Sequence, residues 1–125
     1  MKGYTATIIN TSKELSKKET VLIKDLSNAV ALDTVTADGE HVQIKPAYYA
    51  ELSIHNENAR EKDYPKYILV DEDGTKYITG SRSFWDSFLE IMADMYGSDE
   101  EWMLDVYKMP SKKYQGKAFL TCSII

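Results

Sequence analysis

The segment whose residue types most favour a specific chemistry is KMPSKKYQGK, residues 108–117, which contains four lysines and no acidic residue. Tyr114 lies within it, and Tyr107 and Phe119 flank it. Aromatic rings can stack on unpaired bases while lysines contact the phosphates between them, and this combination is typical of proteins that bind single nucleic-acid strands. The segment therefore predicts a surface for an unpaired strand.

Two strands are expected to hold this segment in place. Between residues 102 and 109, Trp102, Leu104 and Val106 alternate with Tyr107 and Met109, and residues 119–124 alternate in the same way. A period of two predicts strands with a core face and an outer face. Cys122, the single cysteine, falls on the core face and is expected to be a small buried hydrophobic residue.

The aromatic residues at outward positions and the nearby cations form the candidate binding set. Taken alone, the aromatics could be ordinary cross-strand pairs, and the lysines could be solvated loop charges. Their coincidence favours nucleic-acid binding. The stacking candidates are Tyr49, Tyr107, Tyr114 and Phe119, and the candidate phosphate contacts are Lys76, Arg82, Lys108, Lys112, Lys113 and Lys117.

Composition limits the kind of ligand and the compartment. The chain has 125 residues, which fits one domain over 1–125, and its 15 basic and 20 acidic residues give a net charge of −5. A negative overall field argues against sequence-blind duplex binding, although it permits a local basic groove. No apolar run resembles a signal peptide or a membrane span. We therefore expect a cytoplasmic protein, as a monomer or homo-oligomer, without a membrane partner.

Local patterns predict a chain of strands with few helices. Residues 11–20 are expected to be an exposed loop or a short helical turn, residues 29–34 a single helical turn, and the polar residues 56–63 a connection and a candidate clamp over a ligand. In residues 48–55 the pattern places Tyr48, Ala50, Leu52 and Ile54 inward. The earlier strands are predicted at residues 4–10, 21–24, 41–45 and 48–55.

A hairpin and the helix after it are the strongest local predictions. Asp73-Gly74 can supply the positive φ of a tight turn between strands at 66–71 and 76–80. Ser81 or Ser83 can then cap a helix that continues to about Tyr96, and its apolar residues recur at helical spacing. About seven strands and one main helix predict a mainly-β fold, either a curled antiparallel sheet or a partly open barrel closed by the helix.

Catalytic and metal-binding patterns are missing from the sequence. His41 and His55 have no metal-ligand spacing around them and are expected to be surface or hydrogen-bonded histidines. No G-x-S-x-G motif and no glycine-rich loop opens a helix. The DEDG run at residues 71–74 is interpreted as a hairpin turn before a cation site. We therefore expect no enzyme activity, no metal and no cofactor.

Two runs of sequence resemble a known family. IHNENAREKDYPKYILVDEDGTKYITGSRSFWDSFLEI and the terminal KMPSKKYQGKAFLTCSII are similar to single-stranded DNA-binding replication proteins of tailed phages that infect Gram-positive bacteria. The resemblance covers roughly the C-terminal 70 residues well and the first 45 poorly. The matching positions are Asp71, Asp73, Gly74, Tyr77, Ser81, Ser83, Phe84, Lys117, Phe119, Leu120 and Thr121.

This resemblance implies a fold and a function. It implies an OB-fold, a five-stranded barrel with a helix, whose concave face binds unpaired DNA without sequence preference during phage DNA replication. The partners would be single-stranded DNA and phage replication proteins, in the host cell cytoplasm.

Two other functions remain open. A small acidic phage protein could bind a host or replication protein, with its acidic surface as a DNA mimic, and the net charge favours this alternative. A divalent-ion-dependent nuclease would depend on Asp71 and Asp73, but the sequence lacks any catalytic spacing to support it.

Overall fold

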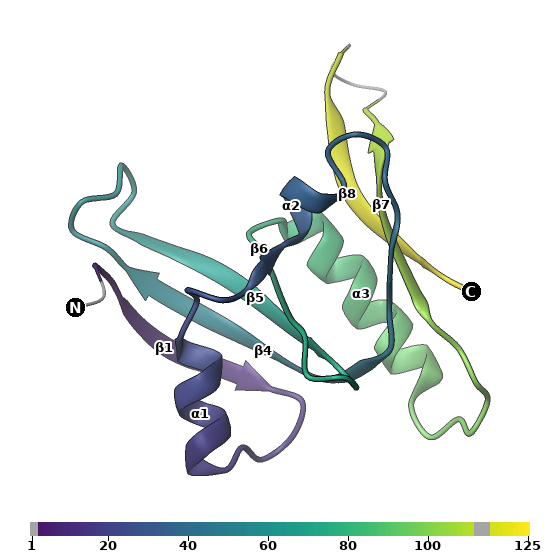
Figure 1. Ribbon diagram of the computed structural model, residues 1–125, viewed down its shortest axis with the longest axis horizontal. Helices are drawn as coiled ribbons and strands as arrows, with labels where there is room; N and C mark the ends of the chain where they lie inside the picture. The colour runs from purple at the N-terminus through teal and green to yellow at the C-terminus, as the bar shows by residue number, and fades with distance from the viewer. Residues whose placement is uncertain (1–2, 112–115) are drawn as a thin grey trace. The chain divides into compact units, whose positions relative to one another are not determined.

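The computed structural model describes residues 3–111 and 116–125 and is mainly β, as predicted (Figure 1). The described residues form a five-stranded sheet with the order β1-β4-β5-β6-β2 and a three-stranded sheet with the order β3-β7-β8. The strands are β1 (Thr5–Thr11), β2 (Val30–Ala31), β3 (Val42–Ile44), β4 (Pro46–His55), β5 (Asp63–Asp71), β6 (Lys76–Thr79), β7 (Leu104–Pro110) and β8 (Ala118–Ile124). The helices are α1 (Lys17–Lys24), α2 (Leu32–Val35) and α3 (Arg82–Met95).

The chain divides into two compact units, each made of two segments. The first unit comprises Met1–Val30 and Ala47–Gly80, and the second unit comprises Ala31–Pro46 and Ser81–Ile125. The expectation that residues 1–125 form one domain stays a prediction. Each unit is described separately below.

The first unit is organised around one face of its antiparallel strands. Ala50, Leu52 and Ile54 of β4 are fully buried, as the alternation predicted, and Tyr48 packs against the same cluster. Ile23 of α1 joins this cluster at 0% exposure, so α1 contributes its apolar side to the core. Ile9 lies at an irregularity in the β1–β4 register and is 59% exposed.

The hairpin of the first unit is confirmed in detail. β5 and β6 pair in register from Tyr67↔Thr79 to Val70↔Lys76. Asp71 and Thr75 close the turn with a 2.9 Å backbone hydrogen bond, and Gly74 has a φ of 89°, which a residue without a Cβ adopts easily.

The helix α1 starts inside residues 11–20, where an exposed loop or a short helical turn was predicted, and it replaces the strand predicted at residues 21–24. Ser16 caps this helix with a complete capping box: its hydroxyl accepts from the Glu19 N–H, and the Glu19 carboxylate accepts from the Ser16 N–H. The box satisfies two N-terminal donors, and Ile23 then anchors the helix in the core. Residues 21–24, whose weak alternation predicted a strand, therefore form the last turn of this helix.

The second unit packs α3 on the three-stranded sheet. Ser81 caps α3 by accepting from the Phe84 N–H, and Gly97 follows with a φ of 80°, so both predicted ends are confirmed. Phe84, Trp85 and Phe88 are 0–2% exposed. The strand residues buried on the matching face, here called the inner face, are Ile44, Leu104, Val106, Leu120 and Cys122.

Neither sheet closes into a barrel within the described residues, so the OB-fold is not confirmed. The reason lies in residues 44–46, where β3 ends at Ile44 and β4 begins at Pro46, with only Lys45 between them. β3 pairs with β7, whereas β4 pairs with β1. Pro46 lacks a backbone N–H and starts β4, a position that proline tolerates at a strand end. The chain thus changes sheet at Pro46 instead of continuing one curved sheet.

None of the helices in the described part of the chain is both long and apolar enough to cross a membrane.

Candidate nucleic-acid interface

The second unit brings several chemistry-bearing side chains onto one sheet face. The β7–β8 register pairs Asp105 with Ser123, Tyr107 with Thr121 and Met109 with Phe119. These residues alternate with the buried inner-face residues, so they share the opposite side of the sheet. We call this side the outer face, and it consists of Gln43, Asp105, Tyr107, Met109, Phe119, Thr121 and Ser123, with His41 directly before β3.

Tyr107 is held in place by two contacts. Its hydroxyl forms a 2.6 Å hydrogen bond with the Ser123 hydroxyl on the neighbouring strand. The His41 ring stacks on the Tyr107 ring, with centroids 4.7 Å apart and planes 14° apart. The predicted stacking residue Tyr107 therefore lies on the outer face, but one face of its ring already carries His41.

His41 is held by Asp105. Its Nδ1 lies 2.9 Å from the Asp105 Oδ2, and the side chain of His41 is 53% exposed while that of Asp105 is 14% exposed. The second carboxylate oxygen, Oδ1, is buried without a hydrogen-bond partner among the described residues. The acid is thus largely shielded from solvent, and its main partner is the histidine ring. The expectation of a hydrogen-bonded histidine is confirmed at this position.

The end of the outer face at Met109 and Phe119 is apolar and exposed. Phe119 and its cross-strand partner Met109 are 41% and 44% exposed. Lys117 precedes β8 and is exposed, and its carbonyl accepts from the Ser111 N–H at 2.9 Å. An exposed aromatic ring beside a lysine matches the predicted combination of stacking and phosphate contact.

Other members of the predicted set lie elsewhere. Lys108 pairs with Leu120 and has the parity of the inner face, so its side chain leaves β7 on the other side from Tyr107. Arg82 begins α3, and its Nε lies 3.0 Å from the Asp86 Oδ1. Tyr49 is half-buried in β4 of the first unit, where its N–H donates to the Ser12 hydroxyl at 2.9 Å. Lys112, Lys113 and Tyr114 lie outside the described residues.

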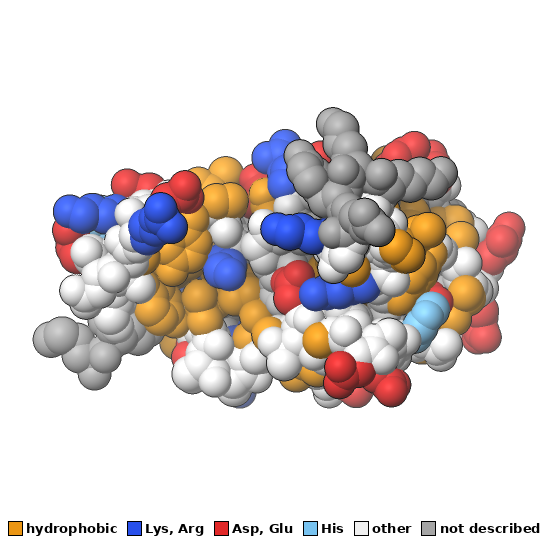
Figure 2. Space-filling view, turned by 90° about the horizontal axis from the view of Figure 1, so that it is seen from above, with side chains coloured by type: hydrophobic (Ala, Val, Ile, Leu, Met, Phe, Trp, Pro, Cys, Tyr) orange, Lys and Arg blue, Asp and Glu red, His pale blue; other side chains and the backbone are white. Residues whose placement is uncertain are grey.

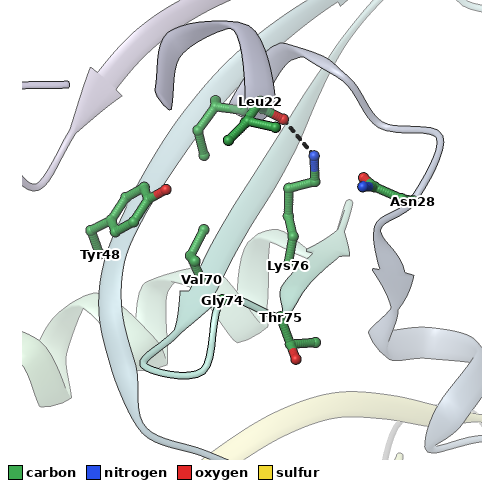
Figure 3. Close-up of a pocket in the computed structure, with 8 residues that line it drawn as sticks. Leu22, Asn28, Tyr48, Val70, Gly74, Thr75 and Lys76 are labelled. Carbon is green, nitrogen blue, oxygen red and sulfur yellow. Dashed lines mark hydrogen bonds between the residues drawn. The ribbon is translucent and has the colours of Figure 1, made fainter. Parts of the chain in front are cut away.

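Lys76 has a structural position in the first unit. It is only 9% exposed, and its ammonium donates to the carbonyls of Leu22 and Asp25 at the C-terminal end of α1. Figure 3 shows the Lys76 side chain reaching the Leu22 carbonyl across a hollow of about 310 Å³, with Tyr48 and Asn28 on either side. Burial lowers its pKa, while Asp25 opposes that shift. An ammonium committed to two carbonyls is a poor phosphate contact, so this placement argues against the predicted role of Lys76.

Charge on the described surface is mixed. In the face seen in Figure 2, lysine and arginine side chains lie among acidic and hydrophobic ones, and no single sign dominates the described side chains. This mixture agrees with a net charge of −5 and with binding that depends on local contacts rather than on a long-range field.

Two observations concern metal-ligating and nucleophilic side chains in the described residues. No three His, Cys, Asp or Glu side chains among them gather as a metal site requires. Cys122 is 8% exposed on the inner face, and burial raises its pKa to about 12, as expected for a packing residue rather than a nucleophile.

Sequence reasoning missed the contribution of His41 to the outer face. The ring reaches Tyr107 because β3 pairs with β7, a contact between segments more than sixty residues apart. The alternation of residues 41–45 gave the correct strand, but it could not name the partner strand.

Comparisons with protein-family models, curated proteins and solved structures found no match for the chain.

Proposed function

We propose that the protein binds single-stranded DNA without sequence preference and acts in phage DNA replication in the host cell cytoplasm. The observation that carries the proposal is the outer face of β3-β7-β8, where Phe119 and the His41–Tyr107 pair present ring surface and where the exposed Lys117 lies two residues before Phe119. The phage setting derives from the resemblance of residues 54–91 and 108–125 to replication proteins. The OB-fold that this resemblance implies belongs to the same proposal.

Binding would combine stacking with a few phosphate contacts. Each stacked base contributes ~1–3 kcal/mol by alanine substitution, so two or three rings suffice for useful affinity. Because α3 covers the inner face through Phe84, Trp85 and Phe88, the outer face is the side of this sheet that can meet a ligand. The site needs no closed barrel, since a flat strand face can carry stacked bases.

Fluorescence anisotropy with labelled oligo-dT and a matched duplex tests the proposal. We expect tight binding to oligo-dT that weakens with salt, and little binding to the duplex. Absence of oligo-dT binding at low salt would reject the proposal, and the acidic interaction protein that binds a host or replication protein would then be the better hypothesis.

A charge-reversal pair sharpens this experiment. Lys117 next to the outer face and Lys18 on α1 are both exposed lysines. The slope of log K against log salt is negative, and K117E should reduce its magnitude by about 0.7, the value for one lost phosphate contact on a single strand. K18E makes the same change of net charge and should leave that slope unchanged. Equal effects of the two variants would indicate a general field rather than a site. A K112E/K113E double variant extends the test to two further lysines of the basic segment, residues 108–117.

A further inference from the structure

The two stacked rings on the outer face, His41 and Tyr107, differ in how far a ligand can reach them. Tyr107 is anchored by Ser123, and His41 covers one face of its ring. A base that approaches this face of Tyr107 meets the imidazole first. The exposed ring of the pair is therefore that of His41, which sequence reasoning regarded only as a surface or hydrogen-bonded residue.

The orientation of His41 is fixed before any ligand arrives. Its Nδ1 bonds to Asp105, and its plane is within 14° of the Tyr107 plane. A side chain already held in one orientation loses less conformational freedom when it binds. At 53% exposure, the imidazole still offers ring surface to a ligand. Histidine rings are among the side chains on which unstacked bases are bound.

The outer face holds a second stacking position on another strand. Tyr107 and Met109 lie two residues apart on the same face, which corresponds to about 7 Å along a strand. Phe119 is directly opposite Met109. His41, directly before β3, and Phe119, on β8, lie on opposite sides of β7, so they are two separate stacking positions that different bases of one strand could occupy.

We infer that His41 is a base-stacking residue: one base of an unpaired strand stacks on the face of the His41 ring that is turned away from Tyr107, and another base of the same strand stacks on Phe119. This inference depends on the proposed single-stranded DNA binding. Asp105 acts on the ligand only through His41 and is a positioning residue.

Three variants and one control test this role by oligo-dT anisotropy. H41A should weaken binding by about 5- to 150-fold, the range for one lost base stack. H41F should retain binding within a few-fold of the parent, because it keeps an aromatic ring. H41L fills similar space without an aromatic face and should bind as weakly as H41A. H55A is the matched control, because His55 is an exposed histidine of the first unit whose ring nitrogens bond to Asp63 and Glu57; it should bind like the parent.

The outcomes separate the inference from the function on which it depends. If the parent binds oligo-dT and H41A binds equally well, His41 is not a stacking residue and the proposed function stands. If H41F is as weak as H41L, the aromatic ring is not what matters and the inference fails. If the parent does not bind oligo-dT at all, both fail. Thermal unfolding of each variant identifies any loss of binding that comes from unfolding, and should H41A not fold, the comparison of H41F with H41L decides the question.

Discussion

Replacing Phe119 with alanine should weaken single-stranded DNA binding while the second unit stays folded. The Phe119 ring is 41% exposed at the edge of the outer face, so part of its surface contributes nothing to the core. A fully buried Phe→Ala change costs ~3–5 kcal/mol of stability, and the cost here should be well below that range. The loss of one stacked base should cost ~1–3 kcal/mol of binding free energy, which is about a 5- to 150-fold increase in Kd.

The assay compares F119A with a matched exposed aromatic. Tyr96 follows α3 in the same unit, is 91% exposed and lies off the outer face, so Y96A should bind oligo-dT like the parent. F119W should restore binding because it keeps a flat ring. Urea unfolding of each variant measures the stability term separately. Equal Kd values for F119A, Y96A and the parent would refute the stacking role of Phe119.

Three further predictions concern the first unit. K76M should lower the free energy of unfolding by ~1–3 kcal/mol, because it leaves two carbonyls at the end of α1 without their buried donor. Urea unfolding measures this loss, with K18M, a change at an exposed lysine, as the control. S16A should cost ~1 kcal/mol through loss of the capping box, with lower helix content by circular dichroism. The His55 ring donates hydrogen bonds to the carboxylates of Asp63 and Glu57, and these bonds raise its pKa above 6.5, the bond to Asp63 having the larger effect. The stabilising contribution of protonated His55 is therefore complete below about pH 6.5 and is lost as pH rises through the raised pKa. A histidine NMR titration should show a lower midpoint in D63N.

Each of these predictions has a contradicting result. Equal unfolding free energies for K76M and K18M would mean that the buried ammonium does not stabilise α1. An S16A variant with unchanged helicity would mean that burial of Ile23 alone maintains the helix. A His55 midpoint at or below 6.5 in the parent would mean that the carboxylate contacts are not populated in solution.

Local signals in the sequence predicted the elements whose stabilising contacts are themselves local. The Asp73-Gly74 turn, the Ser81 cap and the apolar stripe of α3 each lie within a few residues of what they stabilise. The capping box of α1 is also local: Ser16 and Glu19 have the S-x-x-E spacing, which the sequence displays and which could have identified the helix. The prediction of an exposed loop or a short helical turn at residues 11–20 gave too much weight to their polar composition.

Long-range pairing is what the sequence could not provide. A strand was predicted at residues 41–45, where β3 lies, but its partner β7 is some sixty residues away along the chain, and only that pairing brings His41 to Tyr107. The change of sheet at Pro46 has the same character, because alternation specifies which residues face inward and not which strand lies beside them. The sequence therefore identified Tyr107, Phe119 and Lys117 as candidate site residues, but it did not identify His41.

The most direct test of the account is to map oligo-dT binding onto the backbone by NMR. With ¹⁵N-labelled protein, titration of oligo-dT should shift the amides of the outer face, above all Gln43, Tyr107, Phe119 and Thr121, while the core of β4 in the first unit stays unchanged. Shifts confined to the first unit, with the outer face unperturbed at saturating oligo-dT, would contradict the assignment of the binding surface to β3-β7-β8.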